Sequence, residues 1–192
     1  MIMGTQRTRP IIRLAIVIAA LAGLVYYYSP MRSRTGIMPY HAARDRTATI
    51  KMFRDNWYWL IADAGKNTNP EESPFSVEQY LDGGYIAKGE KRDETIAVYC
   101  IDNNMIGLVS YYSESFYKGI LHFIVVDPAH RGRGYAEKLL RHALEDMKKR
   151  GLSLVQLLTR CDNIPAQKLY TKLGFKEFWR DNNFVKFEKE LT

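Results

Sequence analysis

The chain has 192 residues, of which 46% are hydrophobic and 26% charged, a mixture that buries a core and excludes a wholly disordered or collagen-like chain. The net charge of +7 is unevenly distributed: residues 1–46 carry seven Arg and one Asp, whereas residues 47–192 carry 21 Lys and Arg against 20 Asp and Glu. The basic excess therefore lies in the N-terminal segment, and no nucleic-acid partner is expected. The two cysteines have no metal-binding spacing, which excludes a disulfide scaffold and a cysteine-based zinc site, and we predict no metal site.

The N-terminal segment contains a long apolar stretch. Residues 14–28 hold no charge, and residues 11–28 would reach about 27 Å as a helix, near the lower limit of a membrane span. Three tyrosines at its end suit a membrane–water interface. The sequence therefore predicts an N-terminal arm over residues 1–29 that crosses a membrane once through residues 11–28, with the rest of the chain in the cytoplasm. A cleaved signal peptide is one alternative. A mitochondrial presequence is another, because Arg is plentiful and no acidic residue precedes Asp45.

The next part of the chain mixes turn signals with short patterned runs. Residues 30–46, with two prolines and a glycine, are typical of a linker. The alternation in residues 47–53 predicts a first strand. Asp55 is placed to cap a helix through the following aromatic run, and a second, short helix is expected after Ser76, which begins a capping-box pattern.

The pattern then changes to that of a β-sheet. Residues 95–102 and 105–114 are β-rich runs, and Asn103-Asn104 between them predicts a hairpin turn. A third run, residues 120–126, is apolar almost throughout, which indicates a strand buried on both faces. Three consecutive strands are therefore expected in the middle of the chain.

Helical and strand patterns alternate in the remainder. Apolar residues recur at helical spacing from Tyr135, and Gly151 is placed to end that helix. Residues 152–159 predict a further buried strand, residues 165–173 a helix, and residues 178–187 a final β pair. This order of elements predicts an α/β protein with a mixed sheet and helices packed on it.

The junction between the strand over residues 120–126 and the following helix carries a candidate binding motif. Arg131-Gly132-Arg133-Gly134 opens the helix, where glycines let the backbone approach a ligand and unpaired N–H groups favour an anion. This pattern predicts a pyrophosphate cradle to which the two arginines add charge. An ordinary glycine-rich turn is the alternative. The dinucleotide fingerprint G-x-G-x-x-G and the nucleotide-binding G-K-[ST] are both absent.

The chain resembles the GNAT superfamily of acyl-CoA-dependent N-acetyltransferases in two segments. Residues 131–136 read R-x-x-G-x-A, and residues 163–175 match the family pattern N-x-x-A-x-x-L-Y-x-x-L-G-F. They stand in the family's order, with a helix and a strand between them, and the resemblance extends over residues 47–192. It implies a GNAT-like fold with a mixed, mostly antiparallel sheet of about seven strands and four helices.

The resemblance also implies a site for acetyl-CoA, the acyl donor, in a V-shaped gap between the two central strands. Pantetheine is expected along the backbone of residues 124–126, and the pyrophosphate on the amides of residues 132–136. Asn163 is expected to hold the cofactor by hydrogen bonding, and Tyr170 to face the sulfur. The predicted cofactor-binding residues are Ile124, Val125, Val126, Arg131, Gly132, Arg133, Gly134, Tyr135, Ala136, Asn163 and Tyr170.

Acetyl transfer to an amine also requires proton donors and acceptors. Tyr170 is the candidate acid for the leaving thiolate, since a phenol with a pKa of about 10 can protonate a thiolate whose pKa is about 8.5. His122 is the candidate base, because it precedes Val126 by four residues and, in a regular strand, shares its face. A structural histidine, a base at Glu114 and ordered water without a dedicated base are the alternatives. In another GNAT subgroup the base is a Glu or His five residues before the motif's Asn. This chain has Leu158 at that position, so it has no base there.

These features together predict a membrane-tethered N-acetyltransferase. We expect direct attack of a primary amine, carried by a small molecule or a peptide, on acetyl-CoA without a covalent enzyme intermediate, in a chain that can form a homodimer. A tethered CoA-binding module without turnover and an acyltransferase for longer acyl-CoA donors are the alternatives. The acidic stretch over residues 54–84 is either an attractant for a cationic amine or simply solvated.

Overall fold

A computed structural model describes residues 33–61, 69–83 and 93–191 of the chain. Contacts divide the chain into two units at Ser33 and Arg34, and all elements described below belong to the unit Arg34–Thr192. The predicted arm over residues 1–29, with its expected membrane span over residues 11–28, lies outside the described residues.

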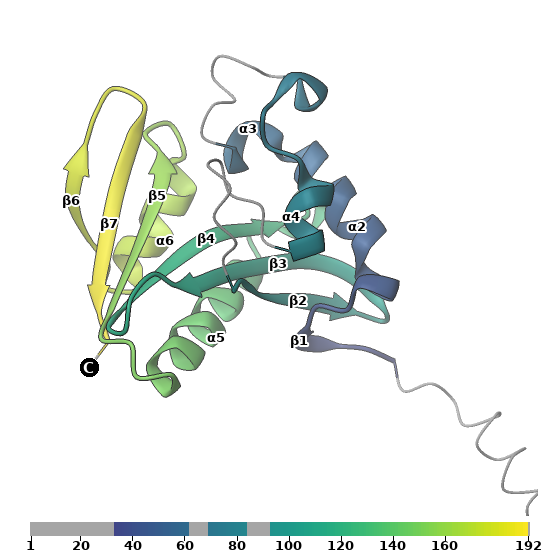
Figure 1. Ribbon diagram of the computed structural model, residues 1–192, viewed down its shortest axis with the longest axis horizontal. Coiled ribbons are helices and arrows are strands. Elements are labelled where there is room, and N and C mark those ends of the chain that lie inside the picture. Colours follow the sequence, from purple (N-terminus) through teal and green to yellow (C-terminus); the bar gives the residue numbers. More distant parts are fainter. Residues whose placement is uncertain (1–32, 62–68, 84–92, 192) are drawn as a thin grey trace, which may run out of the picture. The chain divides into compact units, whose positions relative to one another are not determined.

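The centre of this unit is a sheet of seven strands in the order β1-β2-β3-β4-β5-β7-β6. Every neighbouring pair is antiparallel except β4 and β5, which are parallel (Figure 1). The predicted mixed α/β fold with a mostly antiparallel sheet is therefore confirmed. The strands are β1 (Gly36–Pro39), β2 (Thr95–Ile101), β3 (Asn104–Ser113), β4 (Lys118–Val126), β5 (Leu154–Arg160), β6 (Lys176–Arg180) and β7 (Phe184–Glu190).

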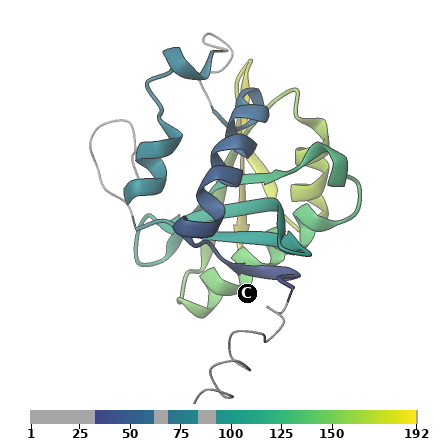
Figure 2. The same ribbon diagram turned by 90° about the vertical axis from the view of Figure 1, so that its right-hand side faces the viewer.

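Helices cover both faces of the sheet. One face packs against α2 (Ala42–Asp55), α3 (Trp57–Leu60) and α4 (Val77–Gly83), and the other against α5 (Tyr135–Lys149) and α6 (Ile164–Lys172). Figure 2 shows α2 lying across the strands. Short 3₁₀ turns occur at Pro70–Glu72 and Pro128–His130. Each face has its own apolar core, which we call the α2 core and the α5 core after the long helix in it.

The predicted linker and first strand are wrong. Residues 36–39 form β1, which pairs with β2 at the edge of the sheet, and residues 47–53 lie inside α2. The apparent alternation in that run is part of a helical pattern, because the buried residues of α2 and its end recur every three or four positions, with one adjacent pair, Met52 and Phe53. These buried residues are Asp45, Thr49, Met52, Phe53 and Asn56.

A buried ion pair fixes the chain where it enters α2. The Asp45 carboxylate, with a side chain 2% exposed, accepts from Arg34 Nη1 at 2.9 Å and from the backbone N–H of His41 at 2.8 Å. A buried charge is costly unless it is paired and hydrogen-bonded. Burial of Asp45 therefore requires Arg34 and the His41 N–H to lie beside it. Residues 34–46 therefore belong to the folded unit.

The predicted cap at Asp55 is wrong, because Asp55 is the last residue of α2 and the N-cap of α3 is Asn56. Other predicted cap and turn signals are found in the structure. The Ser76 hydroxyl accepts from the backbone N–H of Gln79 at 3.2 Å at the start of α4, as the capping-box pattern indicated. Gly151 has a left-handed φ of 84° just after α5. The hairpin between β2 and β3 turns at Asp102-Asn103, with φ of 49° and 69°, one residue earlier than predicted.

A bulge in β4 opens the centre of the sheet. The pairing of β3 with β4 shifts between Ser110 and Tyr111, which leaves His122 as an extra residue in β4. Such a bulge bends and twists its strand. The parallel ladder between β4 and β5 ends beside it, at the pair Leu121 and Leu157. From there the two strands diverge (Figure 1), and the last residues of β4 have no paired strand on the β5 side among the described residues.

The predicted membrane localisation is corrected here. In residues 33–61, 69–83 and 93–191, no helix combines the length and the apolar character that crossing a bilayer requires. The prediction depended on residues 11–28, which are not among those residues.

Gly107 of β3 provides a test of how closely the sheet and α5 pack. A β-carbon there would lie 2.9 Å from the carbonyl oxygen of Val125 and 3.2 Å from Leu139 Cδ1. We expect Gly107→Ala to lower the free energy of unfolding in urea by about 1–3 kcal/mol, because a backbone atom has to move. Gly119→Ala is the matched control: its β-carbon would meet the side-chain ends of Leu152 and Met147, which can shift. An equal or larger loss for Gly119→Ala would contradict this account.

Candidate functional site

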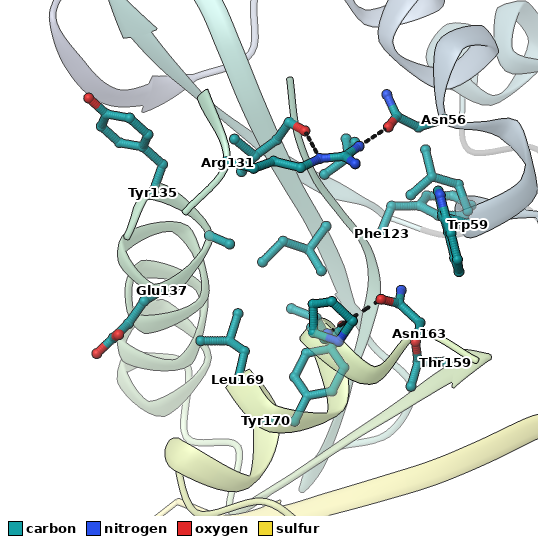
Figure 3. Close-up of a pocket in the computed structure, with 18 of the residues that line it drawn as sticks. Asn56, Trp59, Phe123, Arg131, Tyr135, Glu137, Thr159, Asn163, Leu169 and Tyr170 are labelled. Atoms are coloured by element: carbon teal, nitrogen blue, oxygen red, sulfur yellow. Dashed lines mark hydrogen bonds between the residues drawn. The ribbon is translucent and has the colours of Figure 1, made fainter. Parts of the chain in front are cut away.

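The gap between β4 and β5 contains a cavity of about 530 Å³. Its walls come from the diverging ends of the two strands, the loop before α5 with the first turn of that helix, α6, the end of α3 and Asn56 after α2 (Figure 3). Most of the residues predicted to bind the cofactor line it, namely Ile124, Val125, Val126, Arg131, Gly132, Gly134, Tyr135, Ala136, Asn163 and Tyr170. Arg133 is not among the lining residues. The sequence motifs and the strand gap therefore converge on one place.

The loop between β4 and α5 forms one end of the cavity. Asp127 starts it, where its carboxylate accepts from the backbone N–H of Ala129 at 2.8 Å. Gly132 and Gly134 both have left-handed φ, 74° and 79°, and an ideal β-carbon on either meets no atom within 4 Å. Gly134 is the N-cap of α5, so the first N–H groups of that helix lack a side-chain cap. The loop thus presents backbone donors beside open space, at the positive end of a helix dipole.

Arg131 is oriented differently from the prediction. Its Nε donates to the carbonyl oxygen of Val126 at 3.1 Å, and its Nη2 donates to Asn56 Oδ1 (Figure 3). Asn56 is 3% exposed, and its Nδ2 donates to the carbonyl oxygen of Met52 at 2.8 Å, which turns Oδ1 toward the arginine. The guanidinium therefore satisfies the last carbonyl of β4 and links it to Asn56 at the end of α2. It does not point its charge into the glycine loop, as the prediction had it.

The second motif forms α6 and the opposite wall. Asn163 is the N-cap of this helix, and its Oδ1 accepts from the backbone N–H of Ala166 at 3.4 Å. Tyr170, about two helical turns after Asn163, lines the cavity. It is 4% exposed, and its ring packs against Phe175 and Phe187. Burial raises the pKa of the Tyr170 phenol above its usual range, so the group is held protonated at neutral pH.

His122 lies on the bulge and does not share a face with Val126, so that part of the prediction is wrong. The extra residue reverses the alternation of β4: Leu121 and Val126 both face the α5 core, while Phe123 faces the α2 core. The His122 ring stacks on Phe123, with ring centroids 3.9 Å apart. It still lines the cavity. His122 therefore reaches the cavity because of the bulge in β4, and not because of the regular alternation of side chains along the strand.

A buried carboxylate holds the His122 ring. Nδ1 lies 2.8 Å from Glu94 Oε1 and 3.1 Å from Oε2. The His122 side chain is 25% exposed, whereas that of Glu94 is 4% exposed. Glu94 precedes β2, so its side chain reaches across β3 to contact β4. The other predicted candidate for a base, Glu114, is paired with Lys118 and does not line the cavity.

Comparison with known proteins adds an independent observation. The model of the acetyltransferase (GNAT) family matches residues 53–175, which is more than half of the chain and includes both motifs. The chain belongs to the GNAT family. The family and its fold, predicted from the two motifs, are therefore confirmed.

Relatives of this GNAT chain act on different amines. The [ribosomal protein bS18]-alanine N-acetyltransferase of Haemophilus ducreyi is 39% identical over 61 residues, which cover 32% of this chain and 42% of that protein. The streptothricin acetyltransferase of Escherichia coli is 35% identical over 107 residues, or 55% of this chain and 60% of that protein. The chain thus spans less than two thirds of the length of either relative.

A solved structure shows the same fold. The PaiA N-acetyltransferase of Thermoplasma acidophilum, in complex with coenzyme A, superposes with a TM-score of 0.65 at 20% sequence identity. The superposition covers 81% of this chain and 99% of that one.

Two residues that hydrogen-bond to side chains of the candidate site, Asn56 and Glu94, are not predicted from the sequence. Asn56 had a signal, since it continues the buried helical spacing of α2 as a polar residue. Glu94 had none, because it meets His122 across an intervening strand, 28 residues away in sequence. Among the nearby aromatic residues, Trp59 lines the cavity, while Trp57 and Tyr111 are buried in the two cores.

A polar bridge connects the two walls of the cavity. The Tyr58 hydroxyl of α3 donates to Asp162, in the turn before α6. Arg160 Nη2 donates to the same hydroxyl at 2.7 Å, and its guanidinium lies 4.0 Å from the centre of the Tyr58 ring. Between α5 and α6, Lys172 Nζ contacts Glu137 Oε2 at 2.6 Å. Helix α6 is thus linked to both neighbouring walls.

Asn56→Ala tests the connection between α2 and the end of β4. We expect a loss of about 1–3 kcal/mol in the free energy of unfolding, because both the Met52 carbonyl and the Arg131 guanidinium lose a partner. Urea denaturation measures it. Asn104→Ala is the control, since Asn104 is exposed, and it should stay within about 0.5 kcal/mol of the parent. Equal stabilities of the two variants would refute the structural role of Asn56.

Proposed function

We propose that this GNAT chain is an N-acetyltransferase that moves acetyl from acetyl-CoA to a primary amine by direct attack. The observation that carries the proposal is the cavity between the diverging ends of β4 and β5, which the glycine loop, Tyr170 and His122 all line. The family match and the CoA complex of the structural neighbour support it. Acetyl-CoA supplies an activated thioester, and the residues below bind and orient the reactants.

The glycine loop is the proposed pyrophosphate site. Its left-handed glycines face open space in which a β-carbon would meet no atom within 4 Å, so a ligand can approach the backbone closely. The N–H groups of residues 132–136 and the α5 dipole favour an anion there. The pantetheine arm is proposed to follow residues 124–126, whose backbone has no paired strand on the β5 side in the described part of the chain. The Asn163 amide nitrogen is available to it, since the oxygen caps α6.

Tyr170 is the proposed proton donor to the leaving thiolate. A phenol held protonated by burial donates a hydrogen bond to the sulfur at every physiological pH. Because burial moves its pKa further above that of a thiol, about 8.5, the donation stabilises the thiolate more than it transfers a proton outright. The backbone N–H of Val126 is proposed to polarise the acetyl carbonyl.

His122 is the proposed base. An amine attacks only in its neutral form, and an imidazole in the cavity can take the proton directly or through water. The acceptor is a primary amine on a small molecule or a peptide, in line with a ribosomal-protein alanine and an antibiotic as acceptors of two relatives.

Acetyl-CoA binding to the full chain, measured by calorimetry with CoA as comparison, tests the proposal. Micromolar binding, followed by thiol release when amines are added, supports the transferase. Binding without release for a panel of peptide and small-molecule amines indicates a CoA-binding module. Absence of binding at millimolar ligand by a folded chain would sink both readings.

Gly134→Ala is expected to weaken CoA binding. Gly151→Ala is the matched control, because both glycines have left-handed φ, 79° and 84°, and both face open space. Each variant should lose about 1–2 kcal/mol of stability from the strained backbone. Only Gly134→Ala should also raise the dissociation constant of CoA, since its β-carbon fills space in front of the α5 amides. Equal CoA affinities would place the pyrophosphate elsewhere.

Tyr170→Phe is expected to lower kcat by about 10²-fold and to leave CoA affinity unchanged, because only the donor hydroxyl is removed and the ring keeps its packing. Steady-state kinetics and calorimetry measure the two quantities. Tyr117→Phe removes a hydroxyl outside the cavity and should change neither. A Tyr170→Phe enzyme with parental kcat would exclude the phenol from the chemistry.

A further inference from the structure

We propose that Glu94 is the positioning residue of the site: it fixes the tautomer and the orientation of His122 so that Nε2 faces the acceptor amine. The proposal rests on the function proposed above, in which His122 is the base. Nothing in the two family motifs points to Glu94, which lies 37 residues before Arg131 in sequence, next to the start of β2.

The hydrogen bond determines which ring nitrogen carries a proton. Both Glu94 oxygens lie within 3.1 Å of His122 Nδ1, and an ionised carboxylate can only accept. Nδ1 therefore carries the hydrogen, and in the neutral ring Nε2 keeps its lone pair. That is the nitrogen a base needs, and it belongs to a ring that lines the cavity.

Aromatic contacts fix the plane of the same ring. His122 stacks on Phe123 at an interplanar angle of 24°, and the rings of Tyr80 and Tyr112 meet it edge-on at centroid distances of 5.9 Å and 5.7 Å. These contacts hold the plane of the ring, and of the two orientations related by a 180° flip only the observed one keeps Nδ1 against Glu94. The imidazole thus has one favoured orientation.

Glu94 is too well covered to meet an acceptor itself. Its side chain is 4% exposed and does not line the cavity, whereas His122 is 25% exposed and does. Ser110 and Tyr80 are buried beside this cluster, and Tyr80 lies close enough to Glu94 for the carboxylate to act on its phenol. Burial, with Glu94 as a second cause, raises the pKa of the Tyr80 phenol well above its usual range, so that group stays neutral. Glu94 therefore acts through His122.

The first test is a ¹⁵N NMR spectrum of the full chain near neutral pH. The four histidines give few enough ring signals to assign His122 with a His122→Gln variant. We expect the Nδ1-protonated tautomer at His122. The opposite tautomer would overturn the proposal. This measurement needs no acetyl transfer, so it remains decisive for Glu94 even if the proposed activity is absent.

The second test is kinetic. Glu94→Gln can turn its amide and donate to Nδ1, so we expect a mixed tautomer and a kcat lower by about 10²-fold, within the range a general base contributes. KM for acetyl-CoA should not change. Glu94→Asp keeps a carboxylate and should recover part of the loss and the native tautomer. Glu177→Gln, at an exposed glutamate of β6 that pairs with Arg180 outside the cavity, is the matched control and should leave kcat unchanged.

A double-variant comparison separates positioning from a merely structural role. In a His122→Ala background, Glu94→Gln should cost little further kcat, because its partner is already missing. Equal losses with and without His122, or a shifted tautomer with parental kcat, would show that Glu94 does not act through the imidazole. A fully inactive parent enzyme would instead reject the proposed function and leave the NMR result to decide the positioning role.

Discussion

Hydrogen bonding between β4 and β5 stops at the pair Leu121 and Leu157, and the whole candidate site depends on the space this leaves. Backbone groups at a strand end must find partners or face solvent. Here Arg131 provides one, by donating to the carbonyl oxygen of Val126. The remaining groups along β4 are those on which an extended polar ligand can pair. The gap is thus both an interruption of the sheet and a row of available hydrogen-bonding groups.

Two polar networks stabilise the open part of β4 from different sides. Asn56 connects the end of α2 with Arg131 and so with Val126. Glu94, from the start of β2, holds His122 at the bulge. Both networks contain one residue that is nearly fully buried and one that lines the cavity, an arrangement that fixes the inner polar group and leaves the outer one accessible. Buried polar groups of this kind rigidify a site only when every member is satisfied.

The sequence allowed the family and the mixed sheet to be predicted, because those depend on local patterns. The glycine loop and the start of α6 carry their own turn and cap signals, and both line the same cavity. Two predictions from local patterns were wrong. A strand was predicted at residues 47–53 because a short helical repeat resembles an alternation. The face of His122 was predicted incorrectly because of the bulge in β4. A bulge depends on how β4 pairs with β3, and the sequence of β4 alone does not contain that information.

The short parallel ladder between β4 and β5 also divides the sheet into two halves, one with β1 to β4 and the other with β5, β7 and β6. The α5 core runs beneath both halves, whereas the α2 core includes no residue of β5, β6, β7 or α6 among those described. On the α2 side, the bridge from Tyr58 to Asp162 joins the halves at the surface. One face is therefore joined across the ladder by a shared apolar core, and the other by polar contacts at the surface that salt and solvent weaken. Separating the halves on the α5 face would expose that apolar core to water, whereas on the α2 face it would break polar contacts that water can replace.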